Sequence, residues 1–285
     1  MVSKVAKREQ KPEVSIIIPT FNAANKIAHC LRSIYNQTYT PINVVVIDNF
    51  SSDSTVSIAK TFGAKIAQEK STPGAARNIG VTLSKGKYVF FVDSDQILSR
   101  RLVEECVVKC EKDNAKMVRV QELFIGDGFW GSCSAEWKNY YIKIERKYGK
   151  RRDILSGEPR FFEREQLIQA GMFNASLLWG EDYDMYQRLK QGNVKEVCSE
   201  TKLYHFEPGS IRGIMAKNLR YGESMSTFRR YSDKQVFSRV AKHSILAWGE
   251  TISDLADRPD IALGCTLLLG MKGLAMTAGL LANFM

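Results

Sequence analysis

Two aspartates, Asp93 and Asp95, directly follow the apolar run at residues 88–92. At positions i and i+2 beyond a strand, their carboxylates can meet one hard cation such as Mg²⁺ or Mn²⁺. Such a cation would bridge to a diphosphate and neutralise the charge that builds on a departing nucleoside diphosphate. Acidic turns and helix caps use the same residue types, so the position directly after a strand is what favours a metal site.

Asp48 ends a second β-branched run, at residues 42–47, and a polar stretch follows it. Its carboxylate can accept hydrogen bonds from a base or a ribose. Asp53 or Ser54 can instead cap the helix expected at 54–62. The next expected helix begins with small residues before Arg77, which suits close approach to a phosphate, although an ordinary surface arginine is the alternative.

A further acidic pair, Glu181 and Asp182, follows Gly180 in a stretch rich in Trp and Tyr. Partial desolvation there would raise the proton affinity of a carboxylate, and one of the two could then deprotonate an acceptor hydroxyl. Acidic residues at a helix start also cap the helix or offset its dipole, which is the simpler explanation. His205 is a candidate third metal ligand or phosphate contact, although a hydrogen-bonded core histidine is more common.

Short β-branched runs alternate with helix-period segments in the first hundred residues, a pattern that builds a parallel sheet covered by helices. The expected strands are 14–18, 42–47, 64–67 and 88–92, and the expected helices include 54–62 and 75–84. In such a sheet the ligand lies beyond the carboxyl ends of the strands. The polar residues that follow each strand should therefore converge at one edge.

The composition changes along the chain and predicts its organisation. We expect a polar tail at 1–12, a catalytic domain at 13–208 and a helical region at 209–285. The catalytic domain would comprise a nucleotide-binding half (13–116) and an acceptor half (117–208), the latter with an aromatic and basic insert at 129–152. In the apolar tail 261–284 Lys272 is the only charge, and a helix of this length would extend about 36 Å, enough to cross a bilayer. Its four glycines and the central lysine leave membrane contact and packing against the protein as alternatives.

The net charge of +10 indicates an anionic partner such as phosphates, lipid headgroups or nucleic acid. Six cysteines without a Cys-x-x-Cys pair, and a polar N-terminus, favour a reducing, cytoplasmic compartment. Neither a P-loop nor a dinucleotide-binding glycine signature follows any expected strand. A nucleic-acid-binding module with Tyr140, Tyr141 and Tyr148 among basic residues is a further alternative, but the ordered carboxylates would repel phosphates without a bridging cation.

Five motifs occur in a fixed order, and together they are more specific than any one alone. They are Pro19-Thr20-Phe21-Asn22, Asp48-Asn49-x-Ser51-Ser52-Asp53, Gly74-Ala75-Ala76-Arg77-Asn78-x-Gly80, Asp93-Ser94-Asp95 and Gly180-Glu181-Asp182. This order resembles the family 2 glycosyltransferases of the GT-A fold over residues 14–192. The resemblance implies an α/β fold with a Rossmann-like, mixed and mostly parallel sheet flanked by helices, followed by a helical C-terminal extension that could associate with a membrane.

The resemblance also implies roles for individual residues. Asp182 resembles the catalytic base, with Glu181 beside it, and Asp95 would bind the metal together with Asp93 and His205. The segment 157–162 is similar to the acceptor-side strand of the family. Many relatives have a second aspartate where this chain has Asn49, so the base and ribose preference is left open. The donor-binding residues would be Thr20, Asn22, Asp48, Asn49, Asp53, Arg77, Asp93 and Ser94.

We therefore expect an inverting hexosyltransferase that depends on Mg²⁺ or Mn²⁺ and takes its sugar from a UDP- or GDP-type donor. The acceptor would be a hydroxyl of a saccharide or of a lipid-linked saccharide. The protein would be cytoplasmic, peripheral or C-terminally anchored on an anionic membrane surface, without a nucleic-acid partner. A non-catalytic sugar-nucleotide-binding protein and the nucleic-acid-binding module are the alternatives.

Overall fold

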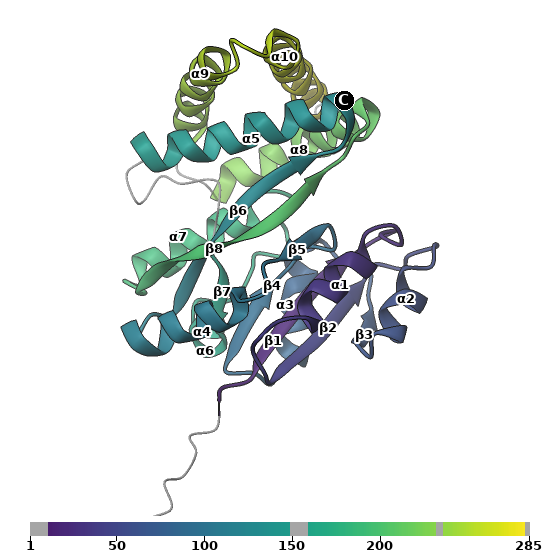
Figure 1. The fold of residues 1–285 in the computed structure, drawn as a ribbon, viewed down its shortest axis with the longest axis vertical. Coiled ribbons are helices and arrows are strands. Elements are labelled where there is room, and N and C mark those ends of the chain that lie inside the picture. The colour runs from purple at the N-terminus through teal and green to yellow at the C-terminus, as the bar shows by residue number, and fades with distance from the viewer. Residues whose placement is uncertain (1–10, 149–158, 232–235, 283–285) are drawn as a thin grey trace, which may run out of the picture.

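The computed structural model describes residues 11–148, 159–231 and 236–282. In these residues eight strands form one sheet in the order β3-β2-β1-β4-β7-β6-β8-β5 (Figure 1). The strands are β1 Val14–Thr20, β2 Ile42–Asp48, β3 Lys65–Gln68, β4 Tyr88–Phe91, β5 Gln96–Leu98, β6 Met117–Gly126, β7 Pro159–Glu163 and β8 Glu196–Glu207. The helices are α1 Ile27–Tyr35, α2 Thr55–Thr61, α3 Pro73–Leu83, α4 Leu102–Asp113, α5 Gly128–Tyr148, α6 Arg164–Gln169, α7 Glu181–Gln191, α8 Ile211–Tyr231, α9 Val236–Asp254 and α10 Pro259–Ala282.

The first four strands pair in parallel, with β1 between β2 and β4 and with β3 outside β2. The expected strands are confirmed, with ends that differ by one or two residues. The apolar runs of β1, β2 and β4 are buried on both faces, as parallel strands between two helical layers require, whereas the edge strand β3 is only partly buried. All four carboxyl ends therefore lie on the same edge of the sheet.

Two hydrophobic cores lie on opposite faces of this sheet. Alternate residues of β1 take part in each: Ile16 and Ile18 pack with α1 and α4 on one face. Ile17 packs with α3, α6 and α7 on the other face. Successive side chains of a strand point to opposite faces of the sheet, so β1 contributes to both cores. The helices therefore pack in two layers, one on each face.

The second half of the sheet is mixed, because β7 runs antiparallel to both β4 and β6. Strand β7 contains Pro159 to Phe162 of the expected acceptor-side strand, whereas Gly157 and Glu158 lie outside the described residues. The long strands β6 and β8 pair in parallel and extend from the sheet to the helical region (Figure 1). The result is the mixed, mostly parallel α/β sheet flanked by helices that the sequence predicted.

The aromatic and basic insert forms the 21-residue helix α5. Tyr140 and Tyr141 pack into apolar clusters of the helical region, and Lys143 forms an ion pair with Asp254 of α9. These two tyrosines are therefore part of helix packing, and they do not form the exposed stacking surface that nucleic-acid binding would need.

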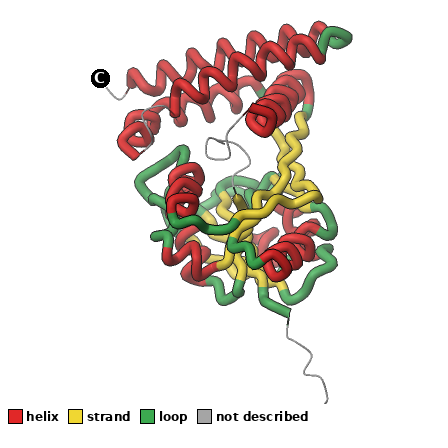
Figure 2. Tube along the Cα trace, turned by 90° about the vertical axis from the view of Figure 1, so that its left-hand side faces the viewer, coloured by secondary structure: helices red, strands yellow, loops and turns green. Residues whose placement is uncertain are grey.

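The helices α5, α8, α9 and α10 form a layer beside the sheet (Figures 1 and 2). α8 and α10 approach closely at two glycines: a Cβ on Gly222 would overlap the backbone of Met276, and one on Gly279 would overlap that of Leu219. Among the described helices α10 alone is long and apolar enough to cross a membrane, and one face of it packs against the protein. β8 ends and α8 begins at the expected boundary near residue 208, but the division into domains stays a prediction.

Candidate active site

A cleft of about 660 Å³ lies beyond the carboxyl ends of β1, β2 and β4. Its floor is formed by the residues after β1 and by Asp93 and Ser94 after β4, and one wall by the start of α3 with Arg77. Leu178 and Arg220 come from the loop before α7 and from α8, so the helical region closes the opposite side. The predicted convergence of strand ends thus produces a concave site of a size that suits a small-molecule ligand.

Thr20 supplies an unpaired polar atom in this cleft. Its hydroxyl oxygen is buried and has no hydrogen-bond partner among the described residues. A buried hydroxyl without a partner costs free energy, which a ligand that bonds to it would recover. Thr20 is therefore suited to contact a donor, as the sequence predicted.

Asp48 is fully buried and its carboxylate is already occupied. It accepts hydrogen bonds from Ser51 N at 2.9 Å and from Gln68 Nε2 at 3.0 Å. Its neighbour Asn49 lines the cleft and accepts from Ser71 N at 3.1 Å. Asp48 therefore organises the loops around the cleft, and its direct contact with a nucleotide stays a prediction.

Asp53 and Asn22 also serve the loops. Asp53 accepts from Thr55 N at 3.0 Å, at the first residue of α2, and from Ala24 N at 3.1 Å, whereas Ser54 makes no capping bond with its side chain. Asn22, at a φ of 46°, accepts from Ser52 N at 2.9 Å. The capping alternative for Asp53 thus matches the geometry, and donor contacts of Asp53 and Asn22 stay predictions.

Arg77 links two of the acidic motifs across the cleft. Its guanidinium donates to Glu181 Oε1 at 2.5 Å and lies 3.4 Å from Asp93 Oδ1. Its other face covers the ring of Phe173, at 5.4 Å from the centroid. The surface-arginine alternative is wrong, because Arg77 is buried and fixes the position of Glu181 relative to Asp93.

Arg160 of β7 holds Asp93 from the other side, with Nη1 3.2 Å from Asp93 Oδ2. It also forms an ion pair with the buried Glu122 of β6. Burial favours the neutral acids, but the neighbouring cations together outweigh it and lower both pKa values to about 2: Arg160, Arg77 and His205 for Asp93, and Arg160 and His205 for Glu122. Both carboxylates are therefore ionised at neutral pH.

Asp95 and His205 lie together at the end of β8. Asp95 Oδ1 is 3.4 Å from His205 Nε2, and its Oδ2 is 3.6 Å from Lys26 Nζ. Burial favours the neutral imidazole, but hydrogen bonds to Asp95 and Glu122 raise the pKa of His205. The Asp95 side chain is 26% exposed, so a ligand can reach it.

A closed cage of protein ligands is not present: in the described residues no group of three His, Cys, Asp or Glu side chains is arranged to hold a metal ion. The Asp93 carboxylate forms ion pairs with Arg77 and Arg160, while the ion-pair contacts of Asp95, to His205 and Lys26, are 3.4 and 3.6 Å long. Mg²⁺ or Mn²⁺ at nucleotide sites typically uses one or two carboxylates, with phosphates and water as the remaining ligands. The oxygen donors and the accessibility of Asp95 fit such an ion, and the metal roles of Asp93, Asp95 and His205 stay predictions.

Gly180, Glu181 and Asp182 begin α7, as the pattern indicated. Gly180 has a φ of 79°, and a Cβ there would overlap the ring of Phe228 in α8. Burial and the neighbouring Asp182 raise the pKa of Glu181, although Arg77 opposes them. Asp182 is half-buried, and no cation of the described chain lies within ion-pair distance of it.

Arg160, Glu122, Gln96 and Arg220 are site residues to which no motif had assigned a role. Gln96 Nε2 bridges Asp93 Oδ2 and His205 Nδ1, at 3.2 Å each. Arg160 lies in the predicted acceptor-side segment, and Gln96 follows the Asp93-Ser94-Asp95 motif directly. These positions in the sequence could have identified Arg160 and Gln96 as site residues. No sequence pattern pointed to Glu122 or Arg220.

Comparisons with known proteins identify the family and the fold. Residues 15–170 match the model of glycosyl transferase family 2. The glycosyltransferase GlyA of Streptococcus pneumoniae is 29% identical over 60% of this chain and 24% of its own length. Chondroitin synthase of Escherichia coli is 29% identical over 73% of this chain and 31% of its own length. The chain thus spans about a quarter to a third of these two relatives.

Two solved structures share the fold. A mannosyltransferase of Pyrobaculum calidifontis, in complex with GDP-Man and Mn²⁺, has a TM-score of 0.64 at 18% identity and covers 97% of this chain and 88% of its own. TarS 1–349 of Staphylococcus aureus, in complex with UDP-GlcNAc, has a TM-score of 0.54 at 16% identity, covering 95% and 90%. The fold is GT-A-like. Because the family model covers more than half of the sequence, the chain belongs to glycosyltransferase family 2.

Proposed function

We propose that the chain transfers a hexose from a UDP- or GDP-type sugar nucleotide to an acceptor hydroxyl and inverts the anomeric carbon. The observation that carries this proposal is that Arg77 and Asp93 line one cleft, and that Arg77 holds Glu181, the neighbour of Asp182, from 104 residues away in the chain. Family membership and two structural neighbours bound to sugar nucleotides support it.

The donor would bind with its nucleoside against β1 and β2 and its diphosphate near α3. Thr20 offers its unpaired hydroxyl, and Asn49 lies beside it in the cleft. Lys70 and Arg220 line the same cleft and can neutralise phosphate oxygens. A divalent ion held by Asp95, with Asp93 and His205 nearby, would supply Lewis-acid stabilisation of the leaving diphosphate.

Asp182 is better suited than Glu181 to act as the base. The Glu181 carboxylate is held by Arg77, whereas among the described residues no cation forms an ion pair with Asp182, which is partly exposed. Asp182 would take the proton of the acceptor hydroxyl as the hydroxyl oxygen bonds to the anomeric carbon. The bond from that carbon to the diphosphate oxygen breaks at the same time, and its electron pair leaves with the nucleoside diphosphate.

The test compares Asp182→Asn with a matched Asp257→Asn control, since Asp257 is exposed in the loop between α9 and α10. In Asp182→Asn we expect calorimetric donor affinity, measured with Mn²⁺, to stay unchanged while turnover falls by about 10² or more. Asp257→Asn should behave like the wild type in both assays. Wild-type turnover in Asp182→Asn would show that another residue is the base. Donor binding without any transfer by the wild type would favour the non-catalytic alternative.

We also propose that α10 lies along an anionic membrane surface. Leu263, Leu267, Met271 and Leu274 repeat at spacings of four, four and three, so they share one helical face, and all are exposed. The opposite face packs against α5 and α8. A helix with one face held by the protein is suited to lie in the interface, where lipid contact would cover the exposed stripe.

A further inference from the structure

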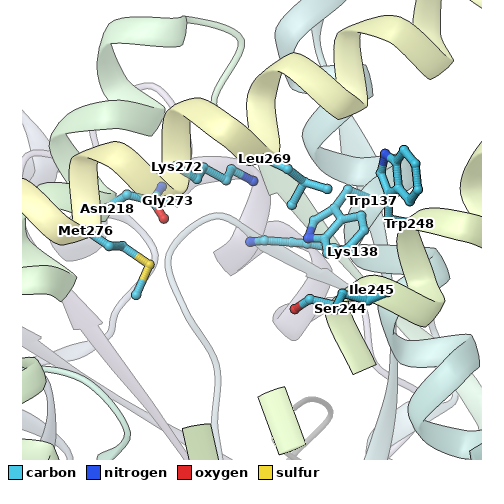
Figure 3. A pocket seen from close by; sticks show the side chains of 10 residues that line it. All are labelled: Trp137, Lys138, Asn218, Ser244, Ile245, Trp248, Leu269, Lys272, Gly273 and Met276. Atoms are coloured by element: carbon cyan, nitrogen blue, oxygen red, sulfur yellow. The ribbon is translucent and has the colours of Figure 1, made fainter. Parts of the chain in front are cut away.

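A second cavity, of about 530 Å³, lies between α5, α8, α9 and α10. Its apolar wall contains Trp137, Trp248 and Leu269. Figure 3 shows Lys138 of α5 and Lys272 of α10 extending into the same space from two different helices. We call this space the lysine cavity. The single charge of the apolar tail therefore points into the protein.

Positive charges outnumber negative charges around the lysine cavity. Glu207 accepts from Lys138 Nζ at 2.5 Å and from Ser134 Oγ at 2.7 Å. Lys272 Nζ reaches only Ser134 Oγ, at 3.0 Å. Lys217 of α8 is a third cation near Glu207, and within the described chain neither Lys217 nor Lys272 has a carboxylate at ion-pair distance.

Lys138 and Lys272 thus share one carboxylate, while Lys217, a third cation nearby, interacts mainly with Tyr221. Burial and the neighbouring Lys138 lower the pKa of Lys272 to about 8, as expected where positive charge is in excess. A bound anion would remove this repulsion. Phosphate suits the arrangement best, because its oxygens can accept from several ammonium groups at once.

The lysine cavity continues into the apolar surface of the helical region. Ile245 and Trp248 of α9 line it and are also exposed, Ile245 to 69%. On α10, Leu269 and Met276 line the same cavity. A ligand whose head group occupies the lysine cavity can therefore place a hydrocarbon chain against Ile245 and Trp248 of α9.

We propose that the lysine cavity binds the phosphate head group of a lipid-linked acceptor, with the hydrocarbon chain along α9 and α10. This inference rests on the proposed transferase function and names the acceptor class. Lys217 connects the two sites, because it lies within electrostatic reach of Asp93 and Asp95 as well as of Glu207. A phosphate held there places the attached saccharide toward the transfer cleft.

The test measures binding of a short isoprenyl phosphate, farnesyl phosphate, to the full chain by calorimetry in the absence of donor. Farnesol is the probe without phosphate. We expect farnesyl phosphate to bind at least about tenfold more tightly than farnesol, which corresponds to one charge-assisted contact. Equal affinity for the two would overturn the proposal.

Two substitutions locate the site. Lys272→Met removes one charge, and Gly273→Leu adds a side chain at a cavity-lining position where a Cβ meets no atom within 4 Å. Each should weaken farnesyl phosphate binding by about tenfold or more, and Lys272→Arg should retain it. The matched control is Lys60→Met, at an exposed lysine of α2. Wild-type binding by both Lys272→Met and Gly273→Leu, in samples with wild-type circular dichroism, would place the ligand elsewhere.

Two further probes separate the possible sources of phosphate. Inorganic phosphate should compete only at much higher concentration, because it lacks the hydrocarbon contacts. Monomeric short-chain phosphatidylglycerol should bind more weakly than farnesyl phosphate, and equal affinity would identify a phospholipid headgroup site and overturn the acceptor assignment.

Donor affinity of Lys272→Met, measured with Mn²⁺, should stay at the wild-type value. If the wild type transfers sugar to a saccharide but does not bind farnesyl phosphate, this inference alone is refuted. If the wild type does not bind donor, the proposed function is refuted.

Discussion

At the scale of residues, the motifs named acids that the structure brings together, but they did not show which side chains hold them. Asp93 and Glu181 were recognised from motifs, yet their shared partner Arg77 lies 104 residues from Glu181 in the chain. Side-chain pairing over such a separation depends on the sheet order, which single motifs do not contain. For the same reason Arg160 and Glu122 had no assigned role, although they fix Asp93 and His205.

The accessible Asp95 carboxylate leads to a prediction about the metal. In the wild type, donor affinity should fall by about tenfold or more when Mn²⁺ is removed with a chelator. Asp95→Asn should lower affinity in the presence of Mn²⁺, and chelation should then have no further effect. Calorimetric titration of donor with and without metal measures both quantities. A full metal response in Asp95→Asn would assign the ion to other ligands, and Asp257→Asn again serves as the control.

At the scale of elements, apolar periodicity was sufficient for the first four strands and for α2 and α3, because each buries its apolar residues in the layer that the period implies. The insert before residue 149 was harder to assign. Its aromatic and basic residues indicated a distinct segment, but the helix α5 is stabilised by packing against α9 and α10, which the local pattern does not reveal. The pairing of β7 between β4 and β6 was likewise beyond any local signal.

The start of α7 depends on a glycine. Gly180→Ala should lower the free energy of unfolding by about 1–3 kcal/mol, because alanine is strained at a φ of 79° and its Cβ meets Phe228. Turnover should fall as well, since Glu181 and Asp182 follow directly. Chemical denaturation and a transfer assay measure the two effects. Gly249→Ala in α9, where a Cβ meets nothing within 4 Å, is the control and should not be destabilising.

The junction of α4 and β8 predicts a pH dependence of stability. Burial opposes ionisation of Glu105, but hydrogen bonds from Thr201 and from Glu200 N outweigh it and lower the pKa of the Glu105 carboxyl. A lowered pKa in the folded state gives stability that is present above the unfolded value, about 4.3, and is lost as the pH falls through the folded value. Glu105→Gln should therefore cost about 1–2 kcal/mol at pH 7 and progressively less below about pH 4.

Urea unfolding of the wild type and of Glu105→Gln across this pH range measures that difference. Glu69→Gln, at an exposed residue after β3, is the control and should have no comparable effect. A difference that stays constant from pH 7 to pH 3 would show that the Glu105 charge does not contribute.

At the scale of the whole molecule, α8 contributes to both candidate sites: Arg220 lines the candidate active-site cleft, while Lys217 lies near the lysine cavity. The basic composition predicted an anionic partner, and these cations occupy two separate places in the fold. Composition alone could not assign the cations to two places, because their positions depend on how α8 passes between the sheet and the outer helices.

Membrane contact is testable with the exposed stripe of α10. Deletion of the helix would expose the apolar cluster that it covers, so substitution is the better test. The triple variant Leu263→Gln, Leu267→Gln, Leu274→Gln should sediment less with anionic liposomes than the wild type, since three exposed apolar side chains are lost. A triple variant at exposed residues of the sheet domain, Val108→Gln, Phe50→Gln, Tyr35→Gln, is the control. Equal sedimentation of wild type and α10 variant would show that α10 is not the contact.

The contact between Gly180 and Phe228 has a consequence for chimeric enzymes. Phe228 belongs to the C-terminal helices, yet it packs on the residue that precedes the acidic pair of the catalytic domain. An exchange of these helices between family members would therefore replace part of the support of Glu181 and Asp182, the latter being the proposed base. Hybrids made at residue 208 should regain activity when an aromatic residue is restored at the position of Phe228.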